Sequence, residues 1–201
     1  MTPHSLAFYV HTVTTGTVLG LRPEDTPEQV AAVLGTDFAE NRSGSRAMGR
    51  DYGLAEFSWH RARGDQPWSG HHFSLQVHRL AHRARTRALP GEALRTRYGR
   101  FAPRLRFEKL RRLLNARGVP LVEIPEYPGN TPYYRTFWQP RSGVAVSFVA
   151  VHGEYSTPGT LRPGDVYRIQ APVTAPEVEL RRARAGEHGA QGGPGGPTAR
   201  A

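Results

Sequence analysis

Two runs within residues 50–80 alternate between apolar and polar positions, and they constrain the fold more than any other part of the chain. In the first run, residues 51–60, the apolar positions two apart are Ala55, Phe57 and Trp59. In the second run, residues 68–80, they are Phe73, Leu75 and Val77. A period of two is typical of strands that bury one face. The link 61–67 is rich in turn-forming residues, so we predict a β-hairpin with one face on a core.

The clearest helix signal begins at Thr26. Thr26 and Gln29 form a Thr-x-x-Gln capping box, and Pro27 suits the first helical position. Gly35 stands where a helix end favours glycine, so we predict a helix over 27–34. A second helix is predicted over 104–117 from an apolar stripe formed by Leu105, Phe107, Leu110, Leu113 and Leu114.

The remaining segments read as strands, turns and tail. Strands are predicted at 6–13, 119–124, 133–139, 144–151 and 166–169. Residues 36–49 read as a link, 91–97 as a helical turn and 177–184 as a helix. The segment from residue 185 is rich in glycine and has almost nothing to bury, so we expect it to be disordered.

The order helix, strand, strand occurs twice, which predicts an α+β fold. We expect antiparallel sheet, in one piece or two, with two or three short helices packed on one face. The expected organisation is a helix-plus-hairpin unit (1–82), an Arg-rich connector (83–103), a second helix-plus-strands unit (104–175) and a disordered tail (185–201). The two units could also form one continuous domain.

Positive charge is concentrated in one stretch. Residues 79–117 hold 13 Arg or Lys against two acids, whereas the rest of the chain is close to neutral within a net charge of +10. The predicted partner-binding patch consists of Arg83, Arg85, Arg87, Arg95, Arg97, Arg100, Arg111 and Arg112. Guanidinium groups suit both carboxylates and phosphates, so an acidic protein or a nucleic acid fits this patch. A third reading is a solvated stretch in which codon bias has enriched arginine.

The composition excludes several classes. There is no cysteine, which removes disulfides, thiolate metal sites and cysteine nucleophiles. No apolar stretch approaches the roughly 20 residues that span a bilayer, and no signal peptide is expected. We therefore predict a cytoplasmic protein with no membrane partner.

No motif for catalysis is evident. The histidines cluster at His60, His71, His72, His78 and His82. Besides binding of an acidic protein or of a nucleic acid, a third hypothesis for the function is a metal-dependent hydrolase that uses these histidines. Against it, His71 and His72 are adjacent on a predicted strand and should point to opposite faces. Asp51 and Glu56 are also expected on opposite faces and make a poor acid–base pair. We expect no cofactor and no metal, and the sequence favours a role without catalysis.

Three segments carry a resemblance. They are Gly20–Gly35, with its Thr-Pro-Glu-Gln helix start, Arg50–Phe57, with Tyr-Gly-Leu-Ala-Glu-Phe, and Leu75–Leu80. Together they resemble actinobacterial proteins of the Streptomyces type, some of which look like immunity proteins of bacterial toxin systems. The match covers about residues 20–80 and consists of structural elements. It implies a cytosolic inhibitor that binds a cognate toxin, and it supplies no catalytic residues.

Overall fold

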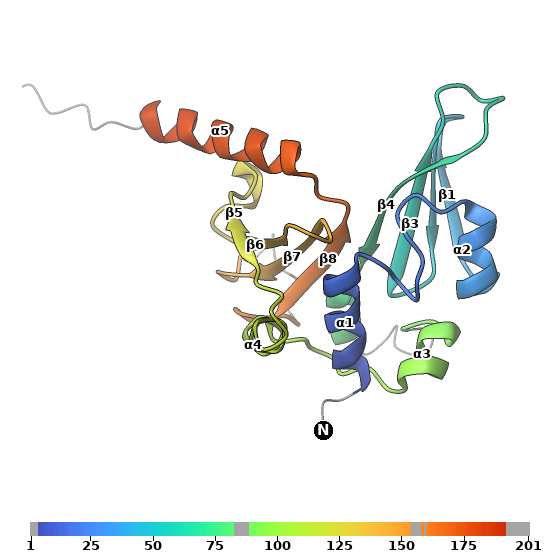
Figure 1. Cartoon of the computed structure of the whole chain (residues 1–201), viewed down its shortest axis with the longest axis horizontal. Helices are drawn as coiled ribbons and strands as arrows, with labels where there is room; N and C mark the ends of the chain where they lie inside the picture. Colours follow the sequence, from blue (N-terminus) through green and yellow to red (C-terminus); the bar gives the residue numbers. More distant parts are fainter. Residues whose placement is uncertain (1–3, 83–88, 154–157, 159, 192–201) are drawn as a thin grey trace, which may run out of the picture.

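Both halves of the chain contribute to one eight-stranded antiparallel sheet (Figure 1). The structure is a computed structural model that describes residues 4–82, 89–153, 158 and 160–191. The first four strands are β1 (Ala39–Ser43), β2 (Ala47–Asp51), β3 (Ala55–His60) and β4 (Ser69–Leu75). The last four are β5 (Val122–Ile124), β6 (Tyr134–Gln139), β7 (Val144–Val149) and β8 (Val166–Ala171). Their spatial order is β1-β2-β3-β4-β8-β7-β6-β5, which confirms the predicted α+β class.

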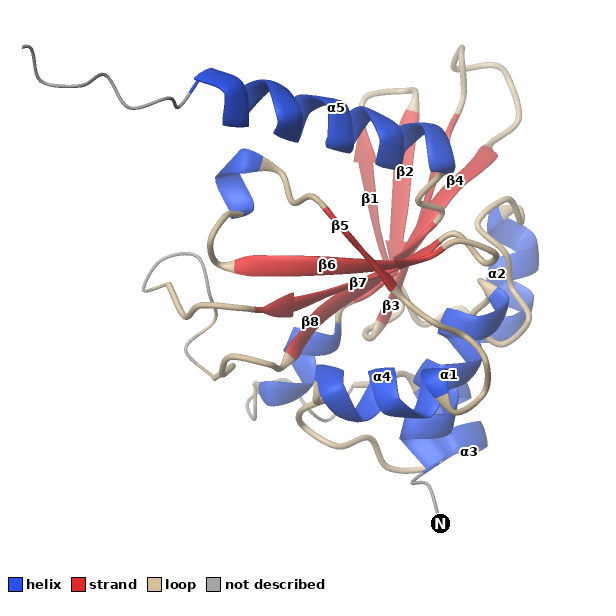
Figure 2. Ribbon diagram, turned by 60° about the vertical axis from the view of Figure 1, so that its left-hand side comes forward, coloured by secondary structure: helices blue, strands red, loops and turns tan. Residues whose placement is uncertain are grey.

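Four helices cover one face of this sheet, and a fifth lies on the other (Figure 2). The covering helices are α1 (His4–Thr15), α2 (Pro27–Leu34), α3 (Glu92–Tyr98) and α4 (Phe107–Asn115). The helix on the other face is α5 (Ala175–Gln191). The described residues also form the short 3-10 turns η1 (Val77–Ala81) and η3 (Pro128–Asn130). The helices are more numerous than the two or three expected, and they do not all share one face.

The start of α2 forms as predicted. The Thr26 side chain accepts a hydrogen bond from the Gln29 backbone N–H at 3.3 Å, and the Gln29 side chain accepts one from the Thr26 N–H at 2.8 Å. This reciprocal pair satisfies two donors that the first turn of a helix would otherwise leave unpaired.

The predicted strand at 6–13 is wrong, because the segment forms α1. Its β-branched and aromatic residues favour a strand on propensity alone. Its buried side chains nevertheless recur at helical spacing, as in Leu6, Tyr9 or Val10, and Val13. Helix α1 packs against α3, α4 and β7. Because it is buried on several sides, it contains the apolar and β-branched residues that propensity alone would assign to a strand.

Several predicted boundaries also move. The predicted link 36–49 contains β1 and most of β2, which were missed because β1 is exposed along its length and has no apolar period. The second run of the hairpin ends at Leu75, and the chain then turns into η1. Helix α5 continues to Gln191, so the first part of the segment expected to be disordered is helical.

The two faces of the sheet differ sharply in character. On the helix-covered face, the central strands bury large apolar side chains: Phe57, Trp59, Phe73, Leu75, Val146, Phe148 and Ile169. On the opposite face the same strands carry Glu56, Ser58, Ser74, Ser147, Arg168 and Gln170. Within the described residues, the second face is covered on its β5–β7 side, where Val178 of α5 packs with Ile124 and Trp138. We call the remainder the open face.

The two halves are related by a pseudo-twofold axis. The β4–β8 ladder is centred on the pair Ser74 and Gln170, and a rotation about that point exchanges the two meanders β1–β4 and β5–β8. Each meander follows a helix, α2 in the first half and α4 in the second. The register also breaks at equivalent places, next to Ser58 in the first half and next to Ser147 in the second. The repeated helix-then-strands order seen in the sequence thus corresponds to a repeated structural unit.

The capping box predicts a measurable contribution to stability. Thr26→Ala removes the side-chain acceptor at the start of α2, and we expect it to lower the free energy of unfolding by about 1 kcal/mol. Urea denaturation followed by circular dichroism measures this. Thr36→Ala, an exposed threonine just beyond α2, is the matched control; an equal loss in both variants would contradict the capping argument.

Candidate functional site

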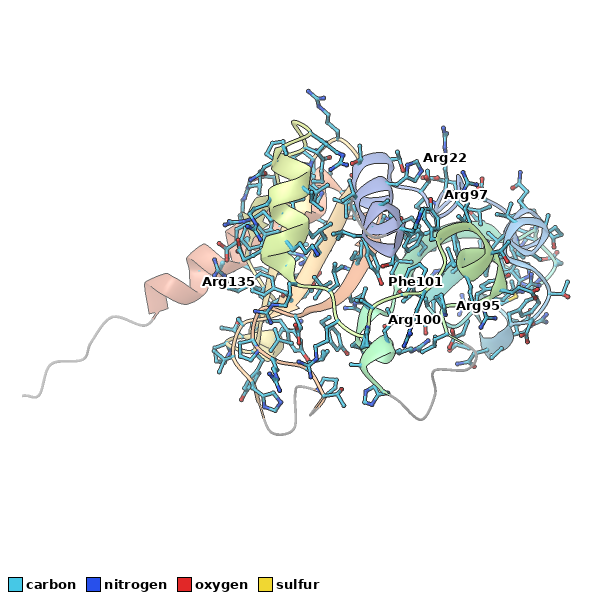
Figure 3. The ribbon with its side chains drawn as sticks, turned by 90° about the horizontal axis from the view of Figure 1, so that it is seen from below. Arg22, Arg95, Arg97, Arg100, Phe101 and Arg135 are labelled. Carbon is cyan, nitrogen blue, oxygen red and sulfur yellow. The ribbon has the colours of Figure 1, made fainter. Side chains whose placement is uncertain are left out.

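The predicted basic patch is divided by the fold. Arg83, Arg85 and Arg87 lie outside the described residues. Helix α3 carries Arg95 and Arg97 with Arg100 just after it, and α4 carries Arg111 and Arg112. Helix α1 contacts both α3 and α4 and lies between them (Figure 3). The five described arginines therefore form two groups on the outer side of the helical layer.

A groove beside α3 brings part of the first group together. We call it the basic groove, a hollow of about 1340 Å³ whose lining includes Arg95, Arg100, Arg104, His82, Leu80, Leu89, Pro90, Phe101 and Pro103. Figure 3 shows Arg95 and Arg100 close to Phe101, with Arg97 and Arg22 on the other side of α3 and Arg135 far away. The groove thus combines cationic side chains with an apolar lining.

Some arginines of the basic stretch are neutralised within the protein. Arg106 contacts the fully buried carboxylate of Asp165 at 2.9 Å, and Arg104 lies 3.8 Å from the same carboxylate. Arg111 pairs with Glu108 at 3.0 Å. A buried carboxylate needs such partners, so the contact with Arg106 is structural.

Other arginines remain available. With the described acids, the side chains of Arg97, Arg100 and Arg112 form no ion pair, and all three residues are exposed. The positive charge that residues 89–117 present to solvent therefore exceeds what neighbouring acids balance.

Arg79, at the start of the basic stretch, also has a structural role. Its guanidinium binds Asp51 at 2.9 Å and Glu56 at 2.5 Å, and it donates to the Gly53 carbonyl at 3.0 Å. Asp51 and Glu56 are direct partners across β2 and β3, so the expectation of opposite faces is wrong. A turn between them reverses the chain and returns both carboxylates to the open face.

The histidines are also arranged differently from the prediction. A β-bulge lies where Ser58 pairs with His72 while Trp59 pairs with Gly70, leaving His71 unpaired. A bulge places neighbouring side chains on the same face. The Nδ1 atoms of His71 and His72 are 2.7 Å apart, and the ring of His71 stacks on that of His60 at 4.3 Å. The expectation that His71 and His72 point apart is therefore wrong.

This imidazole cluster does not form a metal site within the described part of the chain. There, no group of three or more His, Asp or Glu residues is arranged to hold a metal ion. Burial, with the nearby charges of His71 and His60, lowers the pKa of His72. Burial also lowers the pKa of His78, although its contact with the Tyr167 carbonyl opposes the shift.

A second concave site, which sequence reasoning missed, lies where the open face meets the part of the sheet covered by α5. A pocket of about 330 Å³ is formed by β6, β7, β8, η3 and the first turns of α5, and it contains Thr136, Ser147 and Arg168. A signal for it was present, because Ser147 is the one polar residue in the apolar run of β7. The β6–β7 hairpin is joined here by β8 and α5 from later in the chain, so that signal alone did not identify a site.

Comparisons with known proteins give no family. No protein-family model matches the chain, and neither a curated protein nor a solved structure shows significant similarity to it. Among the described helices, none is both long and apolar enough to cross a membrane.

The half-buried histidines His72 and His78 predict a dependence of stability on pH. Because the folded-state pKa values of His72 and His78 lie below the ordinary value of about 6.5, the unfolded chain takes up protons at higher pH than the folded chain. The free energy of unfolding should therefore fall as pH drops from about 8 to about 5.5. Urea denaturation at a series of pH values measures this slope.

The variant His72→Gln/His78→Gln should show a shallower slope, because neither side chain can then take up a proton. His11→Gln, which changes an exposed histidine on α1, should keep the slope of the unmodified protein. Equal slopes in all three proteins would contradict the assignment to His72 and His78.

Proposed function

We propose that this chain is a non-enzymatic, cytoplasmic binding protein that holds an acidic segment of a protein partner in the basic groove. We further propose that the partner is a bacterial toxin and that binding inhibits it. The observation that carries the proposal is the juxtaposition of Arg95 and Arg100 with the apolar lining around Phe101. The resemblance of residues 20–80 to immunity proteins supports the toxin as partner.

The character of the groove favours a protein over a nucleic acid. A peptide offers carboxylates for the guanidinium groups and apolar side chains for Leu80, Leu89 and Phe101. A phosphodiester backbone offers charge without apolar side chains, and its recognition is dominated by salt-dependent contacts to phosphate. A mixed cationic and apolar groove is therefore better matched by an acidic protein segment that also carries apolar residues.

Nucleic acid is the alternative, and one observation favours it. Arg97 and Arg112 are exposed, lack a described acidic partner and lie outside the basic groove on different helices. Phosphates of an extended strand could contact both, which a peptide confined to the groove could not. Binding of an acidic protein segment should depend on the arginines of the basic groove, whereas binding of a nucleic acid should depend on the arginines outside it.

Charge reversal in the groove tests the proposal. Arg95→Glu/Arg100→Glu should weaken binding of a fluorescent peptide of alternating glutamate and leucine by about tenfold or more at about 50 mM salt, because two attractive contacts become repulsive. Fluorescence anisotropy measures the affinity. A polyglutamate peptide of equal charge should bind the unmodified protein more weakly, because it cannot fill the apolar lining.

The matched control is Arg46→Glu/Arg141→Glu, which makes the same change of charge at two exposed turn residues outside the groove. Its affinity should remain near that of the unmodified protein. Equal losses in both double variants would contradict a specific groove. Tighter binding of a single-stranded oligonucleotide than of the peptide, with loss on Arg97→Glu/Arg112→Glu, would favour the nucleic-acid alternative.

Inhibition of a toxin has its own test. The chain should restore growth to cells that express a toxin-like protein encoded beside its gene, and Arg95→Glu/Arg100→Glu should abolish this rescue while Arg46→Glu/Arg141→Glu retains it. Rescue by both variants would show that the basic groove is not the inhibitory surface.

A further inference from the structure

The pocket on the open face has the size and chemistry of a small-molecule site. Its lining includes Glu126, Thr136, Ser147, Tyr134, Tyr167, Arg168, Gln170 and Arg181. A volume of about 330 Å³ lies at the lower end of the range for ligand sites. The ligand must therefore be small, and the predominance of polar side chains requires it to be polar.

A β-bulge builds the cationic side of the pocket. Ser147 pairs with Arg168 and Phe148 pairs with Val166, which leaves Tyr167 without a partner on β7. Tyr167 and Arg168 consequently both line the pocket, although residues adjacent in a regular strand point to opposite faces. The Tyr167 ring lies 4.8 Å from that of Tyr134 and 4.5 Å from that of His78, so two elements hold it in place.

Arg168 has an unmet requirement for a partner. Its Nε atom is buried without a hydrogen-bond acceptor, and its guanidinium forms no ion pair with any acid in the described residues. Its charge instead acts on His72 and His78, whose pKa values it helps to lower. Leaving a buried cationic donor unpaired costs free energy, and an anion in the pocket would remove that cost.

Glu126 provides a complementary anion. Its Oε1 accepts hydrogen bonds from the Tyr127 backbone N–H at 3.1 Å and the Asn130 amide at 3.0 Å, and its Oε2 accepts one from the Thr136 hydroxyl at 2.5 Å. All three donors are neutral, and within the described chain no cation pairs with this carboxylate. Since a carboxylate oxygen has two acceptor positions, Oε2 retains one.

Hydroxyl groups connect the anion to the cation. Thr136, 2% exposed, has a single hydroxyl proton, which it donates to Glu126. The hydroxyl of Ser147, 2.7 Å away, must then donate to Thr136. Ser147 is the register partner of Arg168, and both residues line the pocket. Glu126, Thr136, Ser147 and Arg168 thus form a row with unmatched charge at both ends.

The other charged group of the pocket is already satisfied. Arg181 of α5, 7% exposed, pairs with Glu177 at 2.5 Å and lies 4.2 Å from the centroid of the Tyr127 ring. The hydroxyl of Tyr127 donates to the same Glu177 at 3.2 Å. These contacts join α5 to the segment before η3 at the rim of the pocket. The charged groups that remain to bind a ligand are Arg168 and Glu126.

We propose that this pocket binds a small zwitterion, a free amino acid or a close analogue, with its carboxylate on Arg168 and its ammonium on Glu126. The guanidinium fork suits a planar carboxylate, and Tyr134 and Tyr167 add aromatic lining to the pocket. The pocket is lined from the sheet face that carries Ser147 and Arg168, whereas α3 lies on the other face (Figure 2). The two linings share no residue, so this site is independent of the basic groove.

Calorimetric titration of the full chain with each standard amino acid tests the proposal. At least one should bind with a dissociation constant below about 1 mM. Its amide, which lacks the carboxylate, and its N-acetyl form, which lacks the ammonium, should each bind about tenfold or more weakly. Absence of binding across the panel would overturn the proposal, and equal binding of the N-acetyl form would show a site for simple carboxylates instead.

Two substitutions assign the charges to their residues. Arg168→Gln should weaken the free amino acid by about tenfold or more, and Glu126→Gln should weaken the free amino acid without weakening its N-acetyl form. Arg141→Gln, an exposed arginine in the β6–β7 turn, is the control and should leave binding unchanged. Circular dichroism identifies any variant that is not folded. Unchanged binding in folded Arg168→Gln would overturn the proposal.

Discussion

The pairing of β4 with β8 is the contact on which the rest of the structure depends. It consists of three residue pairs, centred on Ser74 and Gln170, and it turns two four-stranded meanders into one sheet. On the covered side, Phe73 and Leu75 from β4 lie in the same core as Ile169 from β8. The helical layer spans this join, so its burial of apolar surface stabilises the union of the halves as well as each half.

This arrangement separates two kinds of surface. The helices use their apolar sides to cover the sheet and turn arginines outward, which produces the cationic surface around α3 and α4. In the part of the chain that the structure describes, α5 covers the polar face of the sheet on its β5–β7 side, where Val178 contacts Ile124 and Trp138. The edge of that cover borders the Arg168 pocket. The two proposed sites, for a large partner on the helices and for a small ligand on the sheet, therefore do not overlap.

Features encoded locally were predictable from the sequence. The capping box of α2 depends on Thr26 and Gln29 alone, and the two faces of β3 follow from the alternation of residues 55–59. Features that depend on neighbours in space were not. Helix α1 resembles a strand in propensity because it is buried among other elements, and only its i, i+3 and i+4 spacing indicated a helix.

The candidate sites show the same distinction. The basic stretch is contiguous in sequence, so its charge could be predicted, but the separation of Arg97 and Arg112 by α1 could not. The regular alternation of side chains along a strand predicted that His71 and His72 lie on opposite faces. This prediction is wrong because β4 contains one unpaired residue, which interrupts the alternation. The row from Glu126 to Arg168 joins a loop and three strands, and no local pattern in a single segment indicates such a convergence.

The two bulges allow the two halves of the sheet to be compared residue by residue. They occupy equivalent positions under the pseudo-twofold axis, with His71 and His72 in one half matching Tyr167 and Arg168 in the other. A half-chain by itself would end in an uncovered edge strand, whose best partner would be the same strand of an identical copy. A symmetric dimer of half-chains would thus form the same sheet with two identical bulges. In this single chain the two equivalent bulges differ in chemistry, because imidazoles occupy one and a phenol and a guanidinium occupy the other.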